Sequence, residues 1–205
     1  MRAFELTSGG KMTTTHELLS KKTLCSLDKG SIEDLTIRTV HEDGREHVVS
    51  EPVWNDRDSI AVLPFDAEAQ TVLLVRQMRP AVYWRDQDMI LEACAGGIEA
   101  SDLSVEEACR REAAEELGVV IENLQLAAQV FINPARMVEK ANMFLASYKA
   151  GSQDLAGRHQ DEDEDIEVVE VSLDILAGWH KSGDIRCPRL LILTQALLAK
   201  LKETD

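Results

Sequence analysis

The sequence has few basic residues, no long apolar run and no closely spaced cysteines, and each absence excludes a class of protein. It holds 22 lysines and arginines against 37 aspartates and glutamates, a formal net charge of −15 at pH 7. This charge repels a polyanion and argues against nucleic acid as a partner. No stretch approaches the ~18 to 20 apolar residues of a membrane span, and the N-terminus lacks the apolar run of a signal peptide. We therefore expect a cytoplasmic protein with no membrane partner.

The four cysteines indicate neither a disulfide framework nor a zinc site. They lie far apart without a C-x-x-C pair, and the five histidines do not fall at metal-ligand spacing with them. We interpret the cysteines as small core residues. The chain has 205 residues, 44% of them hydrophobic and 29% charged, which is the size and composition of one globular domain with a small appendage.

Short strand-like segments and a few helical ones mix without regular alternation. Residues 1–21 are polar and rich in Gly, Ser and Thr, and they predict a loose tail. Residues 22–53 alternate around Asp43-Gly44 and predict a small antiparallel β element. Residues 54–205 contain the remaining expected strands, at 59–65, 71–78, 89–97, 124–132, 142–150 and 168–171, and helices at 173–181 and 189–202. The class is therefore α+β, a mixed sheet covered by helices.

One further helix is strongly marked and unusually acidic. Ser104 is a predicted N-cap with Glu107 three residues later, and Gly118 stands where a left-handed C-terminal residue belongs. The helix therefore runs from about Val105 to Leu117. At about 100° per residue, the apolar arc of this helix faces the core, and three glutamates fall within or beside that arc.

Glu112, Glu115 and Glu116 are i, i+3 and i, i+4 neighbours, so their charges repel one another. One interpretation is a solvated charged face with Arg110 and Arg111 as ion-pair partners, which is what most charge runs are. The other is a carboxylate cage for Mg²⁺ or Mn²⁺, hard cations that prefer oxygen ligands. The position of the glutamates on the apolar side favours the metal site.

The stretch "GIEASDLSVEEACRREAAEELGV", residues 97–119, resembles the Nudix box, whose spaced pattern is G-x5-E-x7-R-E-U-x-E-E-x-G-U, where U is aliphatic. The matching positions are Gly97, Arg111, Glu112, Ala113, Glu115, Glu116, Gly118 and Val119. Strict counting places Leu103 where the first glutamate belongs. An alternative register that starts at Gly96 places Asp102 there and makes Leu103 an insertion.

The resemblance implies a Nudix α/β/α sandwich and a Mg²⁺-dependent hydrolysis, with Mn²⁺ as a possible substitute. Water attacks a phosphorus of a pyrophosphate that links a nucleoside to another group. By this resemblance Glu112 and Glu116 are the main metal ligands, Glu115 assists, and the main-chain carbonyl of Ala95 is a further ligand. Such chemistry needs a bound cation to neutralise phosphate charge and a carboxylate to accept the proton of the water.

Outside the box, three stretches are similar to the subgroup that hydrolyses ADP-ribose and nucleotide sugars such as GDP-mannose. "VRQMRPAVY" implies Arg79 as a phosphate-binding residue, and "LEACAGGIE" brings in Glu92. "DEDEDIEVVEV" resembles the loop that supplies the catalytic base, which implies Glu162, with Glu164 as second choice and Glu92 or Glu115 next in line. Without the resemblance, this acidic run would be interpreted as a solvated loop.

Other residues are weaker candidates for substrate binding. Arg76 lies three residues before Arg79, an odd offset that points to the other face of a straight strand, so it ranks below Arg79. Trp54 and Trp84 could stack on a base, although tryptophans are more often packing residues. The strands over 22–53 are too few to bury a core alone, and in the similar subgroup this segment builds a homodimer.

The sequence therefore predicts a hydrolase of nucleoside diphosphate sugars that acts as a homodimer. Two alternatives stay open. One is a non-catalytic Nudix-fold sensor of nucleotide sugars, although such modules usually lose cage glutamates and this sequence keeps all three. The other is a hydrolase that clears oxidised nucleoside triphosphates, which the N-terminal strands and the acidic loop disfavour.

Overall fold

The computed structural model describes residues 14–156 and 165–203, and these residues form two compact units. Unit 1 contains residues 14–56 and 135–138, and unit 2 contains residues 57–134, 139–156 and 165–203. In the described part of the chain, no helix combines the length and the apolar character needed to cross a membrane.

Unit 1 is a three-stranded antiparallel sheet in the order β1-β2-β3, built from β1 (Thr15–Leu27), β2 (Gly30–Val40) and β3 (Glu46–Asn55). The predicted hairpin between β2 and β3 is confirmed, and Gly44 takes the positive φ of 78° that its turn requires. The prediction of a loose tail through residue 21 is wrong from Thr15 onward, where β1 begins. Every residue of β1 is exposed, and its leucines do not alternate regularly with polar residues. No period-2 apolar pattern therefore reveals this strand in the sequence.

Unit 2 is built on a seven-stranded mixed sheet. Its central order is β10-β5-β4-β9-β8, with β6 paired to β5 and β7 paired to β4. The strands are β4 (Ser59–Asp66), β5 (Thr71–Gln77), β6 (Ile90–Glu92), β7 (Cys94–Gly97), β8 (Glu122–Phe131), β9 (Lys140–Ser147) and β10 (Ile166–Ser172). Strands β4 and β9 pair in parallel, and the other pairs are antiparallel.

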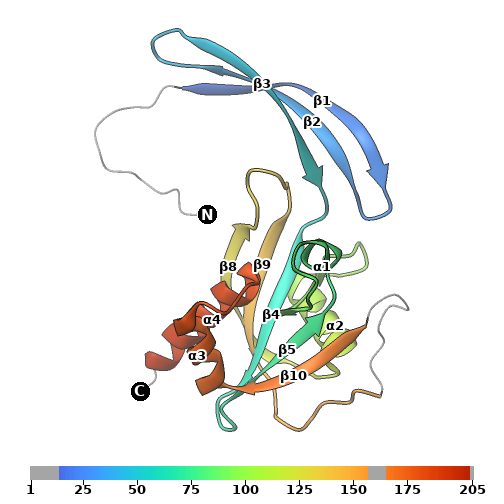
Figure 1. The fold of residues 1–205 in the computed structure, drawn as a ribbon, viewed down its shortest axis with the longest axis vertical. Helices are drawn as coiled ribbons and strands as arrows, with labels where there is room; N and C mark the ends of the chain where they lie inside the picture. The colour runs from blue at the N-terminus through green and yellow to red at the C-terminus, as the bar shows by residue number, and fades with distance from the viewer. Residues whose placement is uncertain (1–13, 157–164, 204–205) are drawn as a thin grey trace. The chain divides into compact units, whose positions relative to one another are not determined.

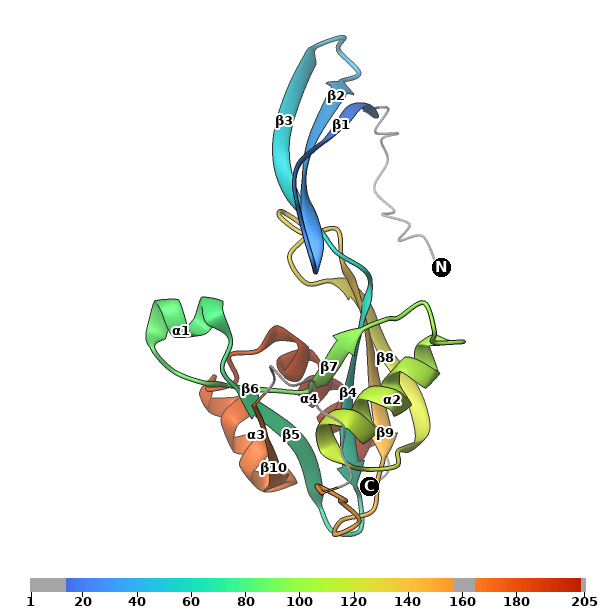
Figure 2. The same ribbon diagram turned by 90° about the vertical axis from the view of Figure 1, so that its right-hand side faces the viewer.

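Helices cover both faces of this sheet, as Figures 1 and 2 show for unit 2. The helices are α1 (Pro80–Asp86), α2 (Val105–Leu117), α3 (Leu173–Ser182) and α4 (Pro188–Lys202). Alternate residues of β4 point to opposite faces: Leu63 packs in one core cluster with α3 and α4, and Ile60 packs in the other with α2. The predicted α/β/α sandwich of class α+β is confirmed.

Two local predictions need correction. The expected single strand over 89–97 is two strands, because the chain breaks at Ala93 and continues beside a different partner. The sequence analysis places no helix after Arg79, whereas the structure has the helix α1 there. Pro80 is its first helical residue, a position that tolerates proline because no hydrogen bond from its nitrogen is needed.

Candidate active site

The acidic helix α2 has the predicted bounds and caps. The Ser104 hydroxyl accepts a hydrogen bond from the Glu107 N–H, and Gly118 ends the helix in the left-handed conformation with φ 65°. Ala108, Cys109 and Ala113 are buried, as the apolar arc predicted. The three glutamates on the same side, Glu112, Glu115 and Glu116, differ in how exposed their side chains are. Glu116 is buried, the side chain of Glu112 is 12% exposed and that of Glu115 is 37% exposed.

Two adjacent glycines of β7 let the strand approach charged side chains closely. A Cβ on Gly96 would lie 1.8 Å from Oε1 of Glu112, and a Cβ on Gly97 would lie 2.7 Å from Nε of Arg57. No side chain fits at either distance without moving its neighbour. The absence of a Cβ at these two positions therefore lets the ends of the Glu112 and Arg57 side chains lie directly against the strand.

The third glutamate contacts the backbone of the same strand. The N–H of Ala95 donates to Oε2 of Glu116 over 3.2 Å, so Glu116 lies against the residue whose carbonyl was predicted as a metal ligand. Cys94, just before it, is fully buried. Burial and then the charge of Glu116 raise the pKa of the Cys94 thiol well above its usual value, so the thiol is protonated at neutral pH.

Arg111 is the cationic partner of two of the three glutamates. Its Nη1 donates to Oε1 of Glu112 over 2.8 Å and to Oε2 of Glu115 over 3.0 Å. Its Nη2 donates to the carbonyl of Gly97 over 3.1 Å. The sequence offered Arg111 only as one possible ion-pair partner, whereas the fold makes it the shared partner of α2 and β7.

The remaining donors of Arg111 go to Asp102. Nε and Nη2 contact the two oxygens of this carboxylate over 3.0 and 2.9 Å, a bidentate pair. The hydrogen bond from Arg111 lowers the pKa of Asp102, and the bond to Asp102 is the largest cause that raises the pKa of Arg111. Leu103, by contrast, is 88% exposed. The geometry therefore favours the register in which Asp102 is the first acid of the box and Leu103 is an insertion.

The chemistry of this cluster suits a hard divalent cation. Asp102 and the three glutamates outnumber Arg111, so the cluster keeps an excess of negative charge on oxygen atoms. Within residues 14–156 and 165–203, no three acidic, His or Cys side chains converge closely enough to hold a metal ion. Glu112 and Glu115 instead accept hydrogen bonds from Arg111, and Glu116 accepts one from Ala95.

The structure brings two of the predicted substrate-binding residues together and separates a third. Nε of Arg79 donates to Oε2 of Glu92 over 2.7 Å. Arg79 is the N-cap residue of α1, and Glu92 is the last residue of β6. Arg76 instead pairs across the β5–β10 ladder with Glu167, over 3.2 Å on the exposed surface. Arg79 and Arg76 therefore have different partners, and their roles in substrate binding stay predictions.

The other predicted site residues belong to unit 1, to the exposed surface of α1 or to the part of the chain that the structure does not describe. Trp54 belongs to unit 1, where its ring lies 2.8 Å from where a Cβ of Gly30 would stand, and its role stays a prediction. Trp84 of α1 is highly exposed. Glu162 and Glu164 lie outside the described residues, so their assignment as base also stays a prediction.

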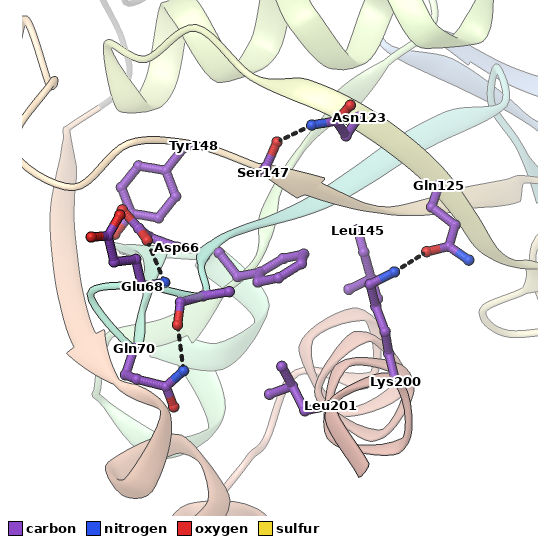
Figure 3. Close-up of a pocket in the computed structure, with 12 residues that line it drawn as sticks. Asp66, Glu68, Gln70, Asn123, Gln125, Leu145, Ser147, Tyr148, Lys200 and Leu201 are labelled. Atoms are coloured by element: carbon purple, nitrogen blue, oxygen red, sulfur yellow. Dashed lines mark hydrogen bonds between the residues drawn. The ribbon is translucent and has the colours of Figure 1, made fainter. Parts of the chain in front are cut away.

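A cavity of 680 Å³ lies elsewhere in unit 2, as Figure 3 shows. Its lining includes Phe65 and Tyr148, whereas the box glycines pair with Ser59 and Ile60 at the opposite end of β4. Polar groups of the lining bond to one another, as Lys200 Nζ does to Gln125 Oε1 over 2.8 Å. This cavity is therefore separate from the acidic cluster.

Comparison with known proteins gives consistent matches. Residues 55–188 match the NUDIX domain family. A GDP-mannose pyrophosphatase of Pectobacterium atrosepticum is 32% identical over 145 residues, 70% of this chain and 74% of the relative. A GDP-mannose pyrophosphatase of Escherichia coli O1:K1 / APEC is 27% identical over 181 residues, 87% of this chain and 93% of the relative. A crystal structure of an ADP compounds hydrolase matches with a TM-score of 0.72 at 19% identity, over 93% of this chain and 96% of that one.

Proposed function

The chain belongs to the Nudix hydrolase family, and from this premise we propose that it hydrolyses the pyrophosphate bond of a nucleoside diphosphate sugar. The products would be a nucleoside monophosphate and a sugar phosphate. The observation that carries the proposal is the acidic cluster of α2 beside β7, in which Arg111 pairs with Glu112 and Glu115 and Glu116 accepts a hydrogen bond from Ala95. The names of the curated relatives favour GDP-mannose, with ADP-ribose as the second substrate to test.

Nudix hydrolases generally use divalent metals, and we propose Mg²⁺, with Mn²⁺ as a substitute. Glu112 and Glu116 would be the main ligands, with Glu115 and the carbonyl of Ala95 assisting. When bound, the cation neutralises phosphate charge and lowers the pKa of a coordinated water. Arg111 contributes by holding Glu112 and Glu115 in place, because its hydrogen bonds to both carboxylates fix their side chains.

The remaining roles follow the sequence predictions. Arg79 would bind a phosphate oxygen with its planar guanidinium, and Glu92 would orient it, since the two side chains are already paired. Arg76 and Trp54 are weaker candidates for substrate contacts. Glu162, or Glu164 in its place, would accept the proton of the attacking water. The new P–O bond forms as the bond to the leaving phosphate breaks, so no other co-reactant is needed.

We also propose that the protein is a homodimer associated through unit 1. Leu18, Ile37 and Val49 are register partners, so they form an apolar row across all three strands. Leu18 is 58% exposed within the single chain. An apolar row on an exposed sheet face is typical of an association surface. We further propose that the protein acts in the cytoplasm, with no nucleic acid or membrane partner.

The experiment is a substrate panel that contains GDP-mannose, ADP-ribose, other nucleotide sugars and nucleoside triphosphates, each with and without Mg²⁺. For the nucleotide sugars, a phosphatase added after the reaction releases phosphate from the newly formed monophosphates and reports turnover. For the triphosphates, whose terminal phosphate a phosphatase would remove directly, inorganic pyrophosphatase reports the pyrophosphate released. Metal-dependent turnover of a nucleotide sugar is the expected result. Turnover of triphosphates alone would favour the clearance enzyme, and no turnover together with nucleotide-sugar binding would favour the sensor.

A further inference from the structure

A buried ion pair of unit 2 contacts the strand that lies beside the box glycines. Arg189, in the first turn of α4, donates through Nη2 to Oε1 of Glu139, and the Ser59 hydroxyl donates to the same oxygen. The side chain of Glu139 is 8% exposed and that of Arg189 is 22% exposed. The Nε of Arg189 is buried and has no hydrogen-bond partner among the described residues. Its guanidinium therefore depends on Glu139 for charge compensation.

The pair continues into a polar network across three strands. Nδ2 of Asn142 donates to the carbonyl of Ser59 over 3.1 Å, and Nε2 of Gln129 donates to Oδ1 of Asn142 over 2.7 Å. These residues belong to β9 and β8, while Ser59 is the first residue of β4. Ser59, the first residue of β4, is therefore bound both through its side-chain hydroxyl and through its main-chain carbonyl.

The same part of β4 supports the acidic cluster. Ser59, Ile60 and Ala61 pair in register with Gly97, Gly96 and Ala95 of β7. Those three β7 residues are the ones that meet Arg111, Glu112 and Glu116. A displacement of Ser59 would therefore be passed to the backbone against which the carboxylates rest.

We propose that Glu139 is a positioning residue for the metal-holding carboxylates, because it fixes the start of β4, and through it β7, between Ser59 and Arg189. This inference rests on the proposed metal-dependent hydrolysis. Stability alone does not account for the pair, since apolar residues of similar volume in place of a buried ion pair are often as stable or more so. A charged pair that accepts a directed hydrogen bond from Ser59 instead fixes the register of the strand.

The test compares Ser59→Ala with Tyr148→Phe. Each substitution removes one hydroxyl that forms a hydrogen bond with another side chain. The Ser59 hydroxyl donates to Glu139, and the Tyr148 hydroxyl lies 2.7 Å from Oγ1 of Thr71. Three measurements are made on the full chain: hydrogen exchange of the amides of residues 94–97, Mn²⁺ affinity by titration, and the Mg²⁺ dependence of turnover.

We expect Ser59→Ala to speed exchange at 94–97 and to weaken Mn²⁺ binding and Mg²⁺ activation by about 10-fold, the range for partners behind metal ligands. Glu139→Gln should do the same to a larger extent, and Tyr148→Phe should change none of the three. Normal exchange and metal affinity in both Ser59→Ala and Glu139→Gln would overturn the proposal. So would a rise in KM in Glu139→Gln alone, which would make Glu139 a substrate contact.

The exchange and Mn²⁺ measurements do not depend on turnover. If the wild-type protein hydrolyses no member of the substrate panel, the proposed function fails, while these two measurements still decide whether Glu139 positions β7. If the wild type is active but both Ser59→Ala and Glu139→Gln match it in exchange and metal affinity, the positioning role alone fails.

Discussion

The two sheets of this chain differ in what covers their faces. In unit 2, residues 60–63 of β4 are fully buried, because α2 packs on one face of the sheet and α3 and α4 on the other. In unit 1, every residue of β1 is exposed, and Leu18 and Val49 present apolar side chains on the surface. A sheet with two covered faces carries its own core, whereas a sheet of three strands with open faces depends on another surface. The difference supports the proposal that unit 2 carries the chemistry and unit 1 the association.

The largest effect is expected from the proposed base of unit 2. Glu162→Gln should lower kcat by roughly 10²- to 10⁴-fold, because that is the usual contribution of a general base. Substrate and metal affinity should stay near the wild-type values, since Glu162 would only accept a proton. Steady-state kinetics at saturating Mg²⁺ measure this. Near-full kcat in Glu162→Gln with a loss in Glu164→Gln would transfer the role to Glu164.

The next effect concerns the acidic cluster. Glu116→Gln should raise the Mg²⁺ concentration needed for half-maximal activity. The increase should exceed the ~10- to 100-fold that is typical when a residue hydrogen-bonded to a metal ligand is lost, and turnover should fall even at high Mg²⁺. The buried carboxylate of Glu116 is replaced by a neutral amide that binds cations poorly. Glu106→Gln, on the exposed side of the same helix, is the matched control. Equal Mg²⁺ curves for the two variants would exclude Glu116 as a ligand.

The comparison of the two units can be tested directly with one leucine from each. Leu63→Ala should lower the free energy of unfolding by about 2 to 5 kcal/mol, because it leaves a cavity in the core of unit 2. Leu18→Asp should leave thermal unfolding of unit 2 within about 0.5 kcal/mol, as for most surface substitutions. It should, however, convert the dimer to a monomer in light scattering. A dimer that survives Leu18→Asp would contradict the assignment of association to this row.

A smaller effect separates the two registers of the box. Asp102→Asn should lower stability by about 1.5 to 3 kcal/mol, the usual contribution of a hydrogen bond to a charged group, because Arg111 loses its bidentate partner. Leu103→Ala should change stability by less than about 0.5 kcal/mol, since its side chain is exposed. Chemical unfolding of both variants measures the difference. The reverse order would restore Leu103 to the box position.

Local patterns predicted the elements whose signals are short in range. The caps at Ser104 and Gly118 and the apolar arc of α2 depend on residues within one or two turns, so the helix was predicted at its observed bounds. The hairpins β2–β3 and β4–β5 also have local turn signals. Strand β1 has none, because its leucines do not alternate regularly with polar residues, and only its pairing with β2 makes it a strand.

The sequence by itself determined the class of the fold, the acidic helix and the three glutamates that match the Nudix box, because each depends on spacing along the chain. Only the tertiary structure decided which groups these residues meet. Arg111 pairs with Asp102, whereas the Leu103 side chain is exposed. Gly96 leaves room for the Glu112 carboxylate, and Glu139 pairs with Arg189, fifty residues further along the chain. The contacts of Glu112 and Glu139 join strands to helices, and that of Arg111 joins α2 to the loop before it. No local preference specifies them, because they arise only when burial of the core brings those elements together.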